Sequence, residues 1–86
     1  MTEFEELLTA VRGAPANTDF ATLVKLMRSA GFDLRMGKKQ HVIFINRTYG
    51  KLQNVAKPHR GPVKPVYVRD CLRIIEELRT LQGETR

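Results

Sequence analysis

The chain has 86 residues, a formal net charge of +6 and an apolar fraction of 42%. This length fits one small domain and is too short for a two-domain enzyme or a doubly wound nucleotide-binding fold. The apolar fraction excludes a disordered tail, and the chain lacks the run of about 18 apolar residues that a membrane span needs. The lone cysteine, Cys71, excludes a disulfide within the chain. The single cysteine and an acidic N-terminus unlike a signal peptide together predict a cytoplasmic location.

The first third of the chain has the apolar spacing of two helices. Apolar residues recur three and four positions apart within residues 2–12, which predicts a short helix. Residues 13–17 contain Gly, Pro and Asn and break this pattern. The same spacing then predicts a second helix, which Thr18 or Asp19 caps and Gly31 ends.

Beyond the second helix, the apolar period changes from about 3.6 residues to 2. Residues 32–36 alternate, residues 40–46 are rich in β-branched and aromatic side chains, and residues 51–57 show a weaker pattern of the same kind. The connections at 37–39 and 47–50 are short and contain glycine, as tight turns do. We therefore expect three antiparallel strands.

A last helix is predicted after a stiff basic loop at residues 58–65. Pro65 suits the first turn of this helix, an apolar stripe runs along it, and Gly83 is expected to follow its end. The order α-α-β-β-β-α predicts an α+β fold in which the last two helices cover one face of a three-stranded antiparallel sheet. The sequence does not fix where the first helix packs.

Positive charge is concentrated in the middle of the chain. Residues 25–69 contain eleven Lys or Arg against the single acid Asp33, a net charge of +10. Residues 1–24 carry −3 and residues 70–86 carry −1. Such a segment indicates a polyanionic partner, of which nucleic acid is the commonest. A basic protein whose cations are only solvated is the alternative.

Few residues in this chain are suited to catalysis. His41 and His59 are the only histidines, and neither they nor Cys71 has the spacing of a metal site or the surroundings of a nucleophilic triad. The basic segment holds one carboxylate, Asp33, whereas two-metal nucleases need several. RNA, however, supplies its own nucleophile, the 2′-hydroxyl. One imidazole for proton transfer and cations for the crowded phosphorane are then enough to cleave it.

Three segments together resemble the HicA family of bacterial toxins, which are mRNA interferases. They read LVKLMRSAGFDL, KKQHVIF and KPHRGPVKPVYVRDCL, in the places of the family's helix ending in Gly-Phe, its Gly-Ser-His strand and its closing loop and helix. The resemblance covers about 62 of the 86 residues, from Phe20 to Leu81. It implies a fold similar to double-stranded-RNA-binding domains. Residues 19–82 would form this core, and residues 1–18 an N-terminal extension of the single domain 1–86.

The resemblance also implies a catalytic residue and a partner. His41 stands at the family's catalytic histidine, and a HicB-like antitoxin is expected to mask it. The chain departs from the family at Lys39-Gln40, where the family usually has Gly-Ser. We expect Gly37 to supply the permissive turn in their place.

The sequence thus predicts a metal-independent endoribonuclease that cleaves mRNA, with His41 as general acid and base and no cofactor. A non-catalytic RNA-binding module of the same fold is the main alternative. A basic adaptor for an acidic protein surface is a weaker one. His41 itself could be an ordinary strand histidine bonded to a neighbouring carbonyl. The residues expected to contact RNA are Arg35, Lys38, Lys39, Gln40 and Arg47 near the strand ends, and Lys57, His59, Arg60 and Lys64 in the loop.

Overall fold

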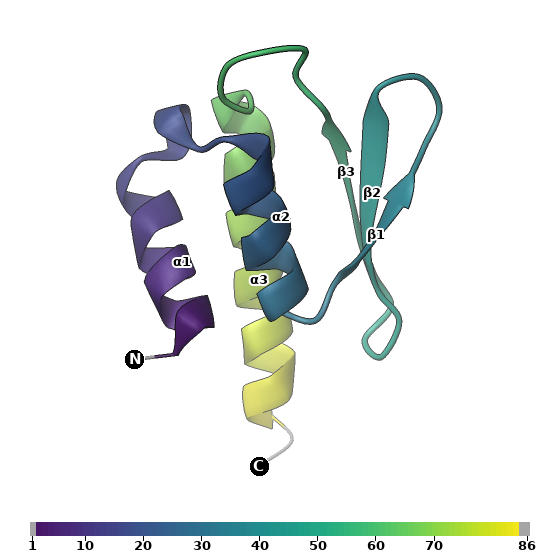
Figure 1. The fold of residues 1–86 in the computed structure, drawn as a ribbon. Coiled ribbons are helices and arrows are strands. Elements are labelled where there is room, and N and C mark those ends of the chain that lie inside the picture. Colours follow the sequence, from purple (N-terminus) through teal and green to yellow (C-terminus); the bar gives the residue numbers. More distant parts are fainter. Residues whose placement is uncertain (1, 85–86) are drawn as a thin grey trace.

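Figure 1 shows the helices on one side of the molecule and a twisted three-stranded sheet on the other. The computed structural model describes residues 2–84. It confirms the α+β class and the order α-α-β-β-β-α, and it adds one turn of 3₁₀ helix between the first two helices. The elements are α1 (Glu3–Gly13), η1 (Pro15–Asn17), α2 (Phe20–Ser29), β1 (Asp33–Met36), β2 (His41–Asn46), β3 (Lys51–Ala56) and α3 (Pro65–Glu84).

Of the two residues expected to cap α2, Thr18 and Asp19, the structure shows that Asp19 is the N-cap. The Asp19 carboxylate accepts a hydrogen bond from the backbone N–H of Thr22 at 2.8 Å, and this bond lowers the pKa of Asp19. The hydroxyl of Thr18 turns back instead and donates to the carbonyl of Ala14 at 3.0 Å. The helix ends before Gly31, which takes a φ of +96° that few other residues tolerate.

The sheet is an antiparallel meander with β2 in the middle. In its register Met36 of β1 lies opposite Val42, and Ala56 of β3 lies opposite His41. Side chains of β2 alternate between the two faces, so Val42 and Phe44 are fully buried while His41 is exposed. One face packs on α2 and α3. We call the other, which carries His41, the open face.

The core lies between this sheet and the helices. It forms because the apolar stripes of the helices and the alternate residues of the strands face the same interior. Each fully buried large side chain contributes roughly 1.5–3 kcal/mol relative to exposure. The buried apolar cluster contains Leu8, Val11, Leu23, Leu26, Met27, Phe32, Val42, Phe44, Val55, Val63, Val68, Cys71, Ile74, Ile75 and Leu78.

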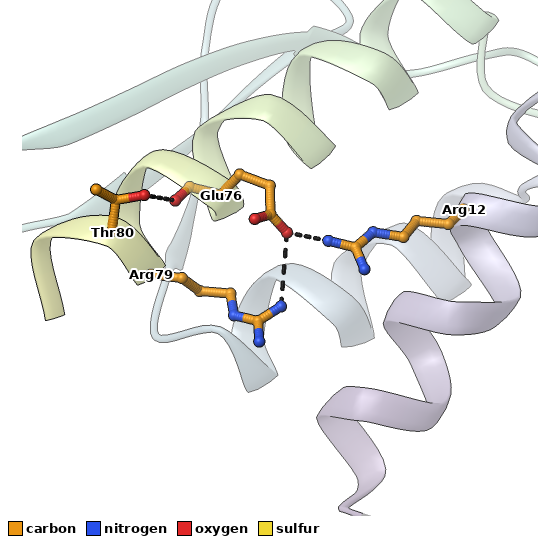
Figure 2. Close-up of polar contacts among 4 residues, drawn as sticks. All are labelled: Arg12, Glu76, Arg79 and Thr80. Atoms are coloured by element: carbon orange, nitrogen blue, oxygen red, sulfur yellow. Dashed lines mark hydrogen bonds and ion pairs between the residues drawn. The ribbon is translucent and has the colours of Figure 1, made fainter. Parts of the chain in front are cut away.

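The place of α1, which the sequence left open, is beside α2 and α3 on the side away from the sheet (Figure 1). Leu8 and Val11 insert into the common core from this helix. Figure 2 shows Glu76 of α3 between two guanidinium groups, that of Arg12 from α1 and that of Arg79 at 3.5 Å. Because these groups are about half exposed, the buried apolar contacts hold α1 more strongly than the ion pairs do.

The last helix is longer than predicted. We expected Gly83 to follow α3, but the helix continues through Gly83 to Glu84. Gly83 needs no positive φ here, and a glycine in an exposed last turn costs the helix only about 1 kcal/mol. Within residues 2–84, no helix combines the length and the apolar character that crossing a membrane requires.

Candidate nucleic-acid interface

His41 is the first residue of β2, and its imidazole projects from the open face. Its two cross-strand neighbours are the smallest side chains available. Ala56 lies opposite on β3, and Gly37 lies opposite on the β1 side, where its N–H donates to the His41 carbonyl at 2.8 Å. A Cβ at Gly37 would stand 3.7 Å from the Cβ of His41. The imidazole is therefore open to a ligand from both flanks.

The connection between β1 and β2 contains the one strained non-glycine residue in the described chain. Lys39 has a φ of 57°, in the left-handed region. The turn closes where the N–H of His41 donates to the carbonyl of Lys38 at 3.2 Å. The expectation that Gly37 supplies the permissive conformation is wrong, because Gly37 pairs with His41 and has no positive φ. The positive φ of this turn falls on Lys39 instead. The HicA family, which the sequence resembles, usually has glycine at this position.

On the other side of this hairpin, the loop after β3 runs alongside Gln40. The N–H of Lys57 donates to the Gln40 carbonyl at 2.7 Å, and the Gln40 amide Nε2 lies 3.3 Å from Nδ1 of His59. The amide donates when Nδ1 carries no proton. Two adjoining hollows share Lys57, Pro58 and His59 and form one basic groove. Its polar lining residues are Lys39, Gln40, Lys57, His59, Arg60 and Lys64.

The two histidines do not share a site. Gln40 lies in the turn before β2, and it lines the groove together with Met36, which is on the same face of the sheet as the buried Val42. Lys57, the partner of Gln40, reaches the helix side, where its Nζ lies 5.4 Å from the ring centroid of Phe20. His59 bonds to Gln40 and lines the groove there, whereas His41 does not line it. The structure thus brings the predicted loop residues to the hairpin end of the sheet but separates His59 from His41.

Arg35 and Arg47 occupy different parts of the sheet. Arg35 is exposed on the open face, directly opposite Ile43 of β2. Arg47 follows Asn46 at the far end of β2, about 20 Å from His41 at roughly 3.3 Å per residue. We expected Arg35 and Arg47 to lie near the same path as Lys38 and Lys39. The structure places Arg47 at the opposite end of the sheet from that hairpin.

Sequence reasoning missed the residues that shape the surroundings of His41. Ala56 was not singled out and Gly37 was expected only to supply a turn, although both become neighbours of His41 once the antiparallel register is known. Cys71 is buried, and burial raises the pKa of its thiol to about 12, with a smaller contribution from the charge of Asp70. Cys71 is therefore part of the core. In the described part of the chain, three or more His, Cys, Asp or Glu side chains do not gather as a metal site would need.

Comparisons of the chain with protein-family models, with curated proteins and with solved structures found no match. The geometry of His41 and the basic groove, with the chemistry that these residues can perform, is therefore what indicates a function.

Proposed function

We propose that this chain is a metal-independent endoribonuclease of the HicA type that cleaves mRNA, with His41 as its general acid and base. The observation that carries the proposal is the setting of His41. Its imidazole is exposed between Gly37 and Ala56 and lies beside a hairpin that presents Lys38 and Lys39. A proton-transfer group, unobstructed and next to fixed positive charge, is what cleavage by the RNA's own 2′-hydroxyl requires.

In the proposed reaction His41 takes the proton of the 2′-hydroxyl while the 2′-oxygen attacks the adjacent phosphorus. The bond from phosphorus to the 5′-oxygen breaks, and this oxygen receives a proton from the imidazolium or from water. The products are a 2′,3′-cyclic phosphate and a 5′-hydroxyl. Lys38 and Lys39 offset the added negative charge of the phosphorane. His59 has no part in these proton transfers, because it lines the basic groove with Gln40, and His41 does not line that groove.

The basic groove supplies affinity rather than chemistry. Lys57, Arg60 and Lys64 line it with His59, and they would hold phosphates that flank the cleaved one. A surface of this charge in the cytoplasm attracts RNA of any sequence, so it needs a protein that covers it. A HicB-like antitoxin with carboxylates facing His41 and Lys39 fits this role, because complementary charge speeds capture.

One observation favours the non-catalytic RNA-binding alternative. Among the described residues, none forms a hydrogen bond with the imidazole of His41. General bases in enzymes are usually oriented by a third group, and this chain offers none in its free state. RNA bound at the groove would have to orient the ring. If it does not, the same surface only binds RNA.

The test compares two histidine variants at saturating RNA. His41→Ala should lower the cleavage rate by about 10² to 10⁴-fold while affinity changes by less than about tenfold, since one imidazole is lost among many cations. His59→Ala should cost much less rate and act on affinity. EDTA should leave cleavage intact, and 2′-O-methyl RNA should resist it. A His41→Ala protein that folds and cuts at the parental rate would refute the assignment, whereas a parent that binds but never cuts would establish the alternative.

A further inference from the structure

The open face continues beyond His41 as a row of three residues, one from each strand. Ile43 is the next β2 residue on this face, about 7 Å from His41 at two residues' rise. The register places Arg35 of β1 directly opposite Ile43 on one side and Asn54 of β3 directly opposite on the other. These three side chains form what we call the second row, next to the first row of Gly37, His41 and Ala56.

The second row combines an apolar centre with two polar ends. Ile43 is half-buried, while Arg35 and Asn54 are exposed. Neither the guanidinium of Arg35 nor the side-chain amide of Asn54 forms a hydrogen bond or ion pair with another described residue. Both groups are therefore available to a ligand. The next row ends in Asp33, whose carboxylate would repel a phosphate and so limits the RNA contact to the first two rows.

This combination is suited to an unstacked nucleobase. Single-stranded RNA is read by splayed bases that lie on apolar or guanidinium planes and bond through their edges to amide side chains. Arg35 offers the plane, Ile43 the apolar floor and Asn54 an amide with both donors and an acceptor. A protein partner would need to place both an apolar and an anionic group here. A nucleotide whose phosphate lies at His41 can by itself place its base over Ile43, about 7 Å away.

We propose that the second row is the subsite for the nucleobase next to the cleaved phosphodiester, and that Asn54 is the residue that reads its edge. The position of the base relative to the cut rests on the proposed function. The subsite itself rests on the register, the exposure of Arg35 and Asn54, and its continuity with the row of His41. It would give the chain a base preference at one nucleotide.

The test maps cut positions in a pool of single-stranded RNA of randomised sequence. The parent should prefer one base, or one pair of bases, at a nucleotide adjacent to the cut. Asn54→Ala should reduce this preference about tenfold, the value of one good amide-to-base contact. Gln53→Ala is the matched control, because Gln53 immediately precedes Asn54 in β3 but lies opposite the buried Phe44 on the helix side. It should leave the preference unchanged. Thermal melting of each variant checks the fold.

A second measurement separates this inference from the proposed function. Binding of uncleavable 2′-O-methyl oligonucleotides that contain only A, only C or only U reports base preference even if the chain cuts nothing. Preference that Asn54→Ala removes and Gln53→Ala keeps supports the subsite, with or without cleavage. Cleavage by a parent without base preference, or equal effects of the two variants, overturns it. Sedimentation of Ile43→Thr gives another check. A change from dimer to monomer with unchanged RNA binding would show that a second copy of the chain occupies this face, which also overturns the proposal.

Discussion

Replacing Lys39 with glycine should make this protein more stable. Lys39 holds a φ of 57°, a conformation that costs a residue with a Cβ about 1–2 kcal/mol. Glycine removes this cost but adds about 0.4–1 kcal/mol of entropy to the unfolded chain. The net gain is about 0.5–1 kcal/mol. For a domain of this length it raises the melting temperature by about 3–6 °C.

Lys38→Gly is the matched control. Lys38 precedes Lys39 in the same exposed turn and has the same charge, but its φ is not positive. Glycine there brings only the entropic cost, so the melting temperature should fall by about 2–6 °C. Calorimetry or circular dichroism of both variants at one pH and one ionic strength makes the comparison. Both variants lose one positive charge, so the change in electrostatic repulsion is the same in each and does not affect the comparison. Shifts of the same sign in the two variants would refute the assignment of strain to Lys39.

Four further outcomes follow from the structure. Binding of single-stranded RNA should weaken with salt at a log–log slope of about −3 to −4, as expected for about five phosphate contacts, and a slope near zero would remove the basic groove from the interface. Cys71 should react with a thiol reagent at pH 8 only after unfolding, since burial raises its pKa to about 12. Stability should also fall above about pH 9, where the unfolded thiol ionises while the folded one keeps its proton. Phe44→Ala should cost about 3–5 kcal/mol in a urea titration, because Phe44 is fully buried between the sheet and the helices.

Most of the fold could be predicted because its elements are specified locally. The apolar period of each segment set its type, and capping residues such as Asp19 and glycines such as Gly31 marked the ends. The place of α1 could not be predicted. It depends on pairs far apart in the chain, such as Arg12 with Glu76, which are 64 residues apart. No local pattern encodes such a contact.

In the candidate site, too, some features follow from the local sequence and others depend on how distant residues pair. The exposure of His41 and its position at a strand start follow from the alternation of β2. The strain at Lys39 does not, because it depends on how β1 and β2 pair. With Met36 opposite Val42 and Gly37 opposite His41, only the residues from Lys38 to Gln40 are left to turn the chain. Gly37, the glycine that looked permissive, is then the last paired residue, and Lys39, two residues later, adopts the left-handed conformation.

The separation of the two histidines has a consequence for any RNA that contacts both. His41 faces the open side of the sheet, while His59 lines the basic groove with Met36 and Lys57 and contacts Gln40 there. A strand that places a phosphodiester at His41 and its neighbouring phosphates in the basic groove must cross the end of the sheet. The hairpin with Lys38 and Lys39 lies at that end and offers positive charge along the crossing. Such a path requires an RNA that bends within a few nucleotides, which a flexible single strand does and a stiff duplex does not. The separate placement of His41 and the basic groove thus favours single-stranded RNA as the substrate of the proposed nuclease.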